Sequence, residues 1–424
     1  MHKAYRFVLG FDDDLVASTL ERLGASKRHS VLDPFSGTGT TLVECKKRGI
    51  DSIGFDANPV CVLISKAKLD WGIGARRIEE SVKDIVKAFD RRYAAYLRAY
   101  RLRKRTNQYY SPLEHPLFER TTAGRFLIES GILKRGWMSP RPALKTLLLT
   151  TVINERVGDT RTQRFLLTSL LDLLVPEISN MRYGPEIYRA VRRRDVDVIG
   201  LFKERVQANL SVLNELRQGC RAFPSSSVSL GDSVNGGLNT IRDSSLDFVV
   251  TSPPYPSEHD YTRLTRLELI FSGFVSEKAD IRTIKQRLLR CCTRNIYSGD
   301  NKYKDISRFR SVRGLVDRIS EEAQNHSHGF AKLYSRVVEE YFGGMFWHFQ
   351  HIARVLRLGG RCAYIVGDQA SFFSIQIKTA ELLSRIATSK GVGLREIEAV
   401  RLRPLRGTTG RQNSNYEWLL ILEK

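Results

Sequence analysis

The sequence predicts an α/β protein in which an open sheet carries a large, mainly helical insertion. Residues 30–59 read as two short strands with a glycine-rich turn and a helix between them, which is typical of a βαβ unit. A buried strand at 246–250 runs into a rigid Pro-Pro loop, and alternating helix and strand patterns return after residue 330. Residues 71–225 read mostly as helices, over far more chain than a simple strand connection needs.

Length and charge limit the classes of function. With 424 residues, the chain is long enough for one domain plus a sizeable insertion or second domain. Lys and Arg number 68 against 46 Asp and Glu, which gives a net charge of +22. This charge favours a polyanionic partner, most simply nucleic acid, over a merely basic soluble protein. No run of 18 apolar residues occurs, so we expect no membrane association.

The cysteines indicate neither a metal site nor a disulfide framework. None of them forms a Cys-x-x-Cys pair, and they are scattered along the chain: Cys45, Cys61, Cys220, Cys291, Cys292 and Cys362. We therefore expect reduced thiols, no metal, and a cytoplasmic location.

The first βαβ unit begins after a short helix predicted at 12–24. That helix has acidic residues at its start and Gly24 just past its end. A strand at 30–32 follows, then a helix beginning at 42–45, then a second strand with its end at 53–59. The turn between strand and helix reads Asp33, Pro34, Phe35, Ser36, Gly37, Thr38, Gly39, Thr40, Thr41.

This turn has the properties of a nucleoside-binding loop. Gly37 and Gly39 let backbone approach a ligand, and the helix start supplies N–H groups for an anion. Asp56 ends the second strand about 20 residues later, where dinucleotide folds place an acid against ribose hydroxyls. The third glycine of the dinucleotide fingerprint and the Gly-Lys of a P-loop are both absent. A nucleoside with a single carboxylate, such as S-adenosylmethionine, fits better.

The second informative loop is Thr251-Ser252-Pro253-Pro254-Tyr255. Its two prolines fix φ and carry no N–H, and the residue before them is held extended. The loop offers one hydroxyl, carbonyl oxygens and one aromatic ring, a set that suits a flat ring with an exposed amino group. The alternative is an ordinary Pro-Pro turn with a packing tyrosine.

Together the two loops resemble the amino-methyltransferase family, which modifies exocyclic nitrogens of DNA bases. The resemblance implies a Rossmann-like methyltransferase fold with a mixed seven-stranded sheet and S-adenosylmethionine as cofactor. It implies that the cofactor is bound by Asp33, Pro34, Phe35, Gly37, Gly39, Thr40, Asp56 and Asp232. It implies that the target base is bound by the catalytic residues Ser252, Pro253, Pro254 and Tyr255.

The resemblance covers roughly residues 1–70 and 226–424. We predict that 1–70 is the N-terminal part of the methyltransferase domain with the cofactor loop, and that 226–424 is its catalytic part. Between them, 71–225 is predicted to be a helical insertion in possible contact with DNA, with helices at 81–105, 142–154, 161–175 and 198–216. Within the catalytic part, 256–330 is expected to be a basic, DNA-facing loop region that contains one helix, at 264–274.

The C-terminal third is predicted to return to regular α/β structure. A long helix at 334–356 places Val337, Val338, Tyr341, Phe342, Met345, Phe346 and Phe349 inward. The pattern then predicts a strand at 361–366, a helix at 371–390, and an antiparallel pair at 395–402 and 416–422 around a loop at 407–414.

The function that this resemblance implies is methyl transfer to cytosine N4 in a base flipped out of double-stranded DNA. Serine at position 252 resembles cytosine-N4 enzymes more than adenine-N6 enzymes, which more often carry Asp there. Adenine N6 is the near alternative, and an RNA guanine amine or an inactive nucleic-acid-binding protein are more distant. A restriction-modification or epigenetic system would make a restriction endonuclease a functional partner. The recognition sequence and oligomeric state stay open.

Overall fold

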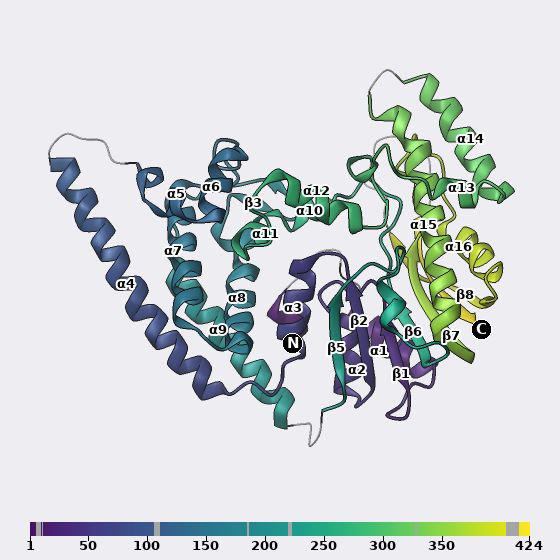
Figure 1. Ribbon diagram of the computed structural model, residues 1–424, viewed down its shortest axis with the longest axis horizontal. Coiled ribbons are helices and arrows are strands. Elements are labelled where there is room, and N and C mark those ends of the chain that lie inside the picture. Colours follow the sequence, from purple (N-terminus) through teal and green to yellow (C-terminus); the bar gives the residue numbers. More distant parts are fainter. Residues whose placement is uncertain are drawn as a thin grey trace. The chain divides into compact units, whose positions relative to one another are not determined.

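The computed structural model describes residues 1–5, 10, 12–105, 111–184, 186–218, 223–326, 329–403 and 415–424. The chain packs into two compact units, which Figure 1 traces along the sequence. The sheet unit comprises Phe11–Asn58, Phe223–Asp260 and Lys285–Lys424, and the helical unit comprises Met1–Gly10, Pro59–Ala222 and Tyr261–Ile284. The domain boundaries at 70 and 225 stay a prediction.

The sheet unit is built on one sheet of seven strands in the order β5-β2-β1-β6-β7-β9-β8. Its strands are β1 (Ser30–Asp33), β2 (Asp51–Asp56), β5 (Ser226–Leu230), β6 (Leu246–Thr251), β7 (Leu356–Gly367), β8 (Gly393–Arg403) and β9 (Asn415–Glu423). The first five strands of the sheet order are parallel, and β9 runs antiparallel to both β7 and β8. This mixed sheet confirms the predicted Rossmann-like fold class and the final antiparallel pair; the predicted loop at 407–414 lies outside the described residues.

The order of the strands fixes where a ligand site can form. The chain proceeds outward from β1 to β2 and β5 on one side, then returns to β6 on the other side of β1. Such a reversal leaves a crevice beyond the carboxyl ends of the central strands, where open α/β sheets bind ligands. Both loops singled out in the sequence follow these strands, because Asp33 ends β1 and Thr251 ends β6.

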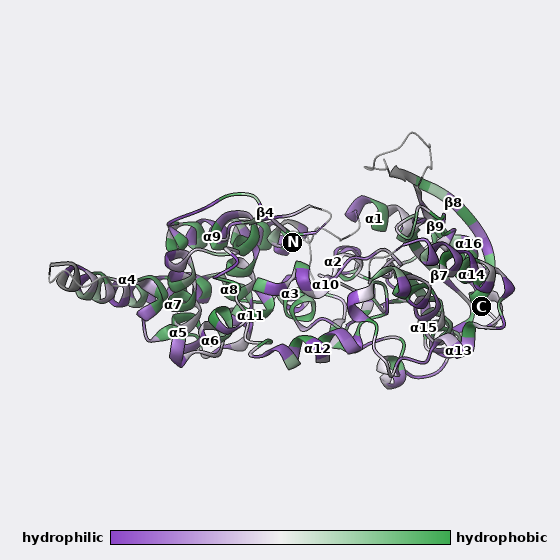
Figure 2. Cartoon of the chain, turned by 90° about the horizontal axis from the view of Figure 1, so that it is seen from above, coloured by the Kyte–Doolittle hydropathy of each residue, from purple (hydrophilic) through white to green (hydrophobic). Residues whose placement is uncertain are grey.

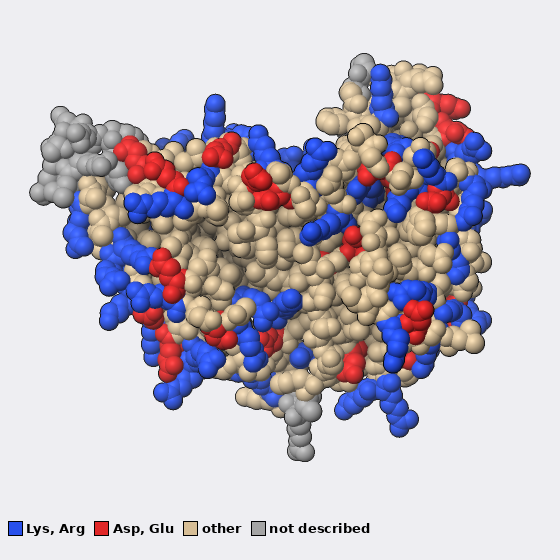
Figure 3. Space-filling view, in the orientation of Figure 1, with Lys and Arg blue, Asp and Glu red and all other residues tan. Residues whose placement is uncertain are grey.

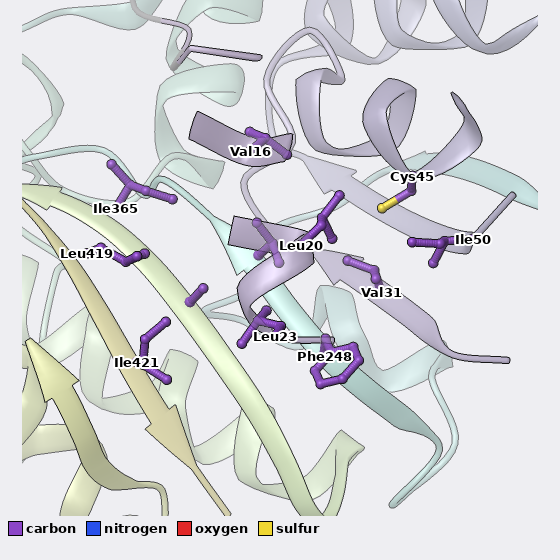
Figure 4. Packing of buried hydrophobic residues seen from close by; sticks show 12 residues of the cluster. Val16, Leu20, Leu23, Val31, Cys45, Ile50, Phe248, Ile365, Leu419 and Ile421 are labelled. Atoms are coloured by element: carbon purple, nitrogen blue, oxygen red, sulfur yellow. The ribbon is translucent and has the colours of Figure 1, made fainter. Parts of the chain in front are cut away.

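One face of the sheet packs against α1 (Asp13–Arg22), which confirms the predicted N-terminal helix. The side chain of Asp12 caps this helix by accepting a hydrogen bond from the amide of Asp14 at 2.9 Å. Figure 4 shows the apolar stripe of the helix facing the sheet. The buried cluster there consists of Val16, Leu20, Leu23, Val31, Cys45, Ile50, Phe248, Val250, Ala363, Ile365, Leu419 and Ile421.

The other face is covered by α15 (Tyr334–Val355) and α16 (Thr379–Thr388). Side chains of β7 alternate, so Ala363 and Ile365 join the α1 cluster whereas Tyr364 packs against His348 and Phe349 of α15. All seven residues predicted to point inward from the long helix are buried. The helix predicted from 371 begins only at Thr379, because Phe373 and Ser374 adopt positive φ values of 55° and 58°.

The helical unit confirms the predicted helices of the middle segment. Its elements are α3 (Pro59–Leu69), α4 (Ala75–Arg105), α5 (Leu117–Arg120), α6 (Thr122–Glu129), α7 (Pro140–Arg156), α8 (Thr160–Leu173), β3 (Met181–Arg182), β4 (Tyr188–Arg189), α9 (Val198–Gln218), α10 (Tyr261–Leu264) and α11 (Arg266–Phe271). Hydrophobic residues concentrate on α7, α8 and α9, whereas much of α4 is hydrophilic (Figure 2). Among the described residues, no helix is long and apolar enough to cross a membrane.

The prediction that residues 256–330 form a loop region is wrong, because much of this segment is helical. It contains α10, α11, α12 (Lys278–Arg287), α13 (Tyr303–Ile306) and α14 (Arg310–Gln324). In α14 the buried residues are spaced three or four apart, as in an amphipathic helix: Val312, Leu315, Ile319 and Ala323. The helix predicted at 264–274 is confirmed as the shorter α11, and the separate α10 precedes it and ends at Leu264.

Gly343 in α15 provides a test of the packing around the sheet. A Cβ at this position would lie 2.2 Å from the carbonyl oxygen of Lys302, so one of the two backbones would have to move. We expect Gly343→Ala to lower the free energy of unfolding by about 1–3 kcal/mol despite the better helix propensity of alanine. Gly314→Ala in α14 is the matched control, since that position is exposed with nothing within 4 Å. Denaturant unfolding that showed both variants stabilised would contradict the close packing.

Candidate active site

The glycine-rich turn links β1 to α2 (Thr40–Lys47). Gly37 and Gly39 have φ values of 50° and 85°, a conformation that glycine adopts without steric cost. Nothing lies within 4 Å of a Cβ built on Gly37, so the turn presents open backbone at that point. The turn is fixed to β2 because the amide of Ser36 donates a hydrogen bond to the carbonyl of Phe55 at 2.9 Å.

Asp33 joins the two loops. Its Oδ1 accepts hydrogen bonds from the hydroxyl of Thr251 at 2.6 Å and from the amide of Phe35 at 3.2 Å. Its Oδ2 is buried and has no hydrogen-bond partner. Burial raises the pKa of Asp33 to about 6, against the opposing effect of these hydrogen bonds. A buried carboxylate oxygen without a donor marks a place where a cationic ligand group would be stabilised.

Asp56 holds the turn from the end of β2. Its Oδ2 accepts a hydrogen bond from the amide of Gly37 at 2.8 Å, and its Oδ1 accepts one from the amide of Asn58 at 2.8 Å. Burial raises its pKa to about 6, and the two amide donors lower it. Asp56 therefore shapes the glycine turn and keeps further lone pairs for a ligand hydroxyl.

Asp232 lies beyond the end of β5, the strand next to β2. Its Oδ1 accepts hydrogen bonds from the amides of Val234 at 3.0 Å and Asn235 at 2.5 Å. The loop is tied to the neighbouring strand, because the amide of Gly231 donates to the carbonyl of Asp56 at 3.0 Å. Three predicted acids thus follow three adjacent strands of the sheet.

The Ser252–Tyr255 loop is anchored by a contact that the sequence did not reveal. The phenol of Tyr255 donates a hydrogen bond to Oε1 of Glu417 in β9 at 3.0 Å, and the Ser252 hydroxyl lies 3.3 Å from the same phenol oxygen. A Cβ on Gly367 at the end of β7 would lie 3.1 Å from the Tyr255 ring. Pro253 is buried, and Ser252, Pro254 and Tyr255 are half-buried.

A second contact missed from the sequence supports the glycine turn from α15. The ring centroids of His348 and Phe35 are 5.0 Å apart, and Nε2 of His348 lies 2.6 Å from the hydroxyl oxygen of Tyr364. Burial lowers the pKa of His348 to about 3, so the imidazole is neutral at ordinary pH. Among the remaining predicted cofactor residues, Pro34 is buried and Thr40 begins α2.

These residues suit S-adenosylmethionine. Asp33 offers an unpaired buried oxygen for the ammonium group of the methionine moiety, and the start of α2 offers amides for its carboxylate. Asp56 and Asp232 have carboxylates that could accept hydrogen bonds from the nucleoside hydroxyls and amino group. The donor and acceptor set therefore matches a ligand with a cation, one carboxylate and an adenosine.

The comparisons with known proteins agree with this arrangement. A family model described as "DNA methylase", for N6 and N4 methyltransferases, matches residues 15–67. Type II methyltransferase M.BsoBI of Geobacillus stearothermophilus is 24% identical over 441 residues, covering 98% of this chain and 83% of that protein. Type II methyltransferase M.AvaI of Nostoc sp. is 23% identical over 444 residues, covering 98% and 82%.

A third relative is similar over a short stretch only. Type II methyltransferase M.MjaII of Methanocaldococcus jannaschii is 54% identical over 39 residues, which is 9% of this chain and 7% of that protein. The match begins within α1 and continues through β1, the glycine turn, α2 and β2 into α3, so it includes both Asp33 and Asp56. In its sheet order, its two loops and these matches, the chain is similar to DNA methylases of the N6 and N4 amino-methyltransferase family.

Proposed function

We propose that the protein is a Type II DNA methyltransferase that transfers a methyl group from S-adenosylmethionine to the exocyclic N4 of cytosine. One observation carries the proposal: the 2.6 Å hydrogen bond between Thr251 and Asp33 joins the glycine turn to the Ser252–Tyr255 loop. Methyl donor and acceptor amine have to meet within van der Waals distance, and this bond sets two matching loops side by side. The names of the full-length relatives support the Type II assignment and a restriction-modification context, with a restriction endonuclease as functional partner.

The cofactor half of the site has a separate task for each acid. We assign Asp33 to the ammonium group, Asp56 to the ribose hydroxyls and Asp232 to the adenine. Pro34, Phe35 and Thr40, with both glycines, shape the wall of the turn and the helix start. When bound, S-adenosylmethionine would supply a methyl group activated by the positively charged sulfur. The protein's contribution is then binding and orientation.

The base half of the site has to activate the exocyclic amine of the base, which is a weak nucleophile. The lone pair of an exocyclic amine is delocalised into the ring, so acceptors that hold the amine hydrogens favour a pyramidal, more reactive nitrogen. We assign this role to the hydroxyl of Ser252 and the carbonyl of Pro253. Tyr255 stacks on the base, a contact worth roughly 1–3 kcal/mol, which offsets part of the few kcal/mol needed to flip the base out of the duplex.

Cytosine is preferred over adenine because residue 252 is serine. The resemblance associates serine at this position with cytosine N4 and aspartate more often with adenine N6. Adenine N6 is the alternative substrate, and the same stacking and acceptor groups would serve it. Incubation with tritiated S-adenosylmethionine and unmethylated duplex DNA tests the proposal. Label in the DNA supports it, and label only in RNA or in neither would contradict it.

Double-stranded DNA would be held by the basic surface of the chain. Lys and Arg side chains are spread over elements of both units on the face drawn in Figure 3, with acidic residues among them. Exposed arginines lie on α4 and on the helices that replace the predicted loop region, including Arg98, Arg101, Arg287, Arg310 and Arg313. We propose that the segment 71–225 is an insertion whose arginines contact phosphates, which supplies affinity without reading sequence.

The affinity for S-adenosylmethionine is expected to rise between pH 5 and pH 7. The pKa values of Asp33 and Asp56 are raised to about 6, so both carboxyls are largely protonated at pH 5 and ionised at pH 7. Only an ionised Asp33 can pair with the ammonium, so binding should release protons in this window. Calorimetry across the range checks this. Asp33→Asn should bind more weakly and with a shallower pH dependence, because Asp56 still ionises in the same window, and affinity that falls as the pH rises would contradict the assignment.

A further inference from the structure

A hydrogen-bonded chain of three side chains extends from the Pro-Pro loop into β9. Ser252 Oγ lies 3.3 Å from Tyr255 Oη, which lies 3.0 Å from Glu417 Oε1. Glu417 is only 7% exposed, although it is separated from Tyr255 by 162 positions in sequence. It pairs in register with Gly367, the residue whose missing side chain makes room for the tyrosine ring. The adjacent strands β7 and β9 thus hold the side chain of Tyr255 between Gly367 and Glu417.

The chemistry of the three groups fixes the direction of the chain. An ionised carboxylate only accepts hydrogen bonds, and a phenol has a single hydrogen to donate. The Tyr255 hydrogen is therefore assigned to the 3.0 Å contact with Glu417. In the contact with Ser252 the phenol oxygen is left as the acceptor, so the serine hydroxyl is the donor. The serine hydroxyl donates its only hydrogen to the oxygen of Tyr255. Towards any other group, Ser252 can therefore only accept hydrogen bonds.

We propose that Glu417 is a positioning residue that makes Ser252 a pure hydrogen-bond acceptor for the amino group of the target base. The inference rests on the function proposed above and deepens it. An uncommitted serine hydroxyl can donate as well as accept, so it would also hold a base carrying an oxo group. A serine whose hydrogen is committed favours N–H donors and opposes carbonyl oxygens, which selects amino-bearing cytosine or adenine over thymine.

The same contact fixes the stacking surface. Tyr255 is held at its hydroxyl by Glu417, and its ring edge lies against the backbone of Gly367, where a Cβ would be 3.1 Å away. A ring fixed at two points loses less conformational entropy when a base stacks on it. Glu417 would then influence the chemical step through Tyr255 and Ser252, without touching the cofactor turn.

The test is a double-mutant cycle with Glu417→Gln and Tyr255→Phe, measured by single-turnover methylation of unmethylated duplex DNA. Glutamine keeps the shape of the side chain but can donate as well as accept, and phenylalanine keeps the ring but removes the phenol oxygen. We expect each variant to lower the single-turnover rate about tenfold, with the Kd for S-adenosylmethionine and for DNA changed less than about twofold. The double variant should be no slower than Tyr255→Phe, because Glu417 acts only through that oxygen.

Glu423→Gln is the matched control, since Glu423 lies at the far end of the same strand and pairs with Arg395. It should leave the rate unchanged. An undiminished rate for Glu417→Gln, or losses that multiply in the double variant, would overturn the inference alone. Wild-type protein without transfer to DNA would overturn the proposed function and the inference with it. If Glu417→Gln lost cofactor binding through misfolding, Tyr255→Phe would decide: a tenfold loss supports the chain, and a wild-type rate overturns it.

Discussion

Replacing Tyr255 with alanine is expected to lower the rate of methyl transfer about 100-fold or more while leaving the affinity for S-adenosylmethionine within about twofold. In the proposed function the ring supplies stacking worth about 1–3 kcal/mol and its hydroxyl, 3.3 Å from that of Ser252, orients the serine, so two favourable contributions would be lost together. Each 1.36 kcal/mol corresponds to about tenfold in rate. Ser252→Ala should also lose methylation and keep cofactor binding, because it removes one of the two proposed acceptors for the amine hydrogens.

Single-turnover assays and calorimetry on the same preparations separate the two effects. Tyr188→Ala is a suitable control, since this tyrosine of β4 is 51% exposed and lies outside the sheet unit. Its methylation rate should stay close to that of the wild type. If calorimetry showed that Tyr255→Ala abolishes binding of S-adenosylmethionine, the division between a base loop and a cofactor turn would be wrong.

The second large effect is expected for Asp56→Ala, which should weaken binding of S-adenosylmethionine by about 100-fold. The substitution removes the acceptor proposed for the ribose and also the carboxylate that holds the amides of Gly37 and Asn58, each at 2.8 Å. Hydrogen bonds to a charged group contribute about 1.5–3 kcal/mol each, so losing them together exceeds a tenfold change.

Asp51→Ala is the matched control for this prediction. Asp51 begins the same strand at the opposite end of the sheet, is exposed, and accepts a hydrogen bond from the amide of Ser225 at 2.8 Å. Isothermal titration should show near-normal cofactor affinity for Asp51→Ala. Equal losses in the two variants would show that Asp56 contributes only to stability.

The features that sequence predicts well here are local. The βαβ unit follows from a short apolar strand, a glycine turn and an acid at the next strand end, all within 30 residues or so. The long helix α15 is predicted because its apolar residues recur at helical spacing over many turns. Both kinds of signal are contained in a short stretch of chain.

The helices of 256–330 were missed for a physical reason. In α14 the buried stripe of Val312, Leu315 and Ile319 is narrow, and charged residues occupy the other sides of the helix. Overall polarity then resembles that of a loop, although the periodicity is helical. Counting the spacing of the few apolar residues would have identified this helix.

The contacts of the site that were missed are non-local. Glu417 meets Tyr255 because β7 and β9 pair in a register that sets Gly367 opposite Glu417. Thr251 meets Asp33 because β1 and β6 are neighbours in the sheet. Strand order and register depend on packing across the whole unit, so these two contacts cannot be predicted from a local pattern of residues.

The most direct test of the central claim is to identify the methylated nucleoside. Unmethylated duplex DNA is incubated with the protein and isotopically labelled S-adenosylmethionine, digested to nucleosides and analysed by mass spectrometry, with Ser252→Ala as the inactive control. The proposed function predicts labelled N4-methyldeoxycytidine that is absent with the control. Label at N6 of deoxyadenosine would keep the site and correct the base. Label on carbon 5 of cytosine, or no label in DNA, would contradict a site in which Ser252 and Tyr255 hold an exocyclic amine.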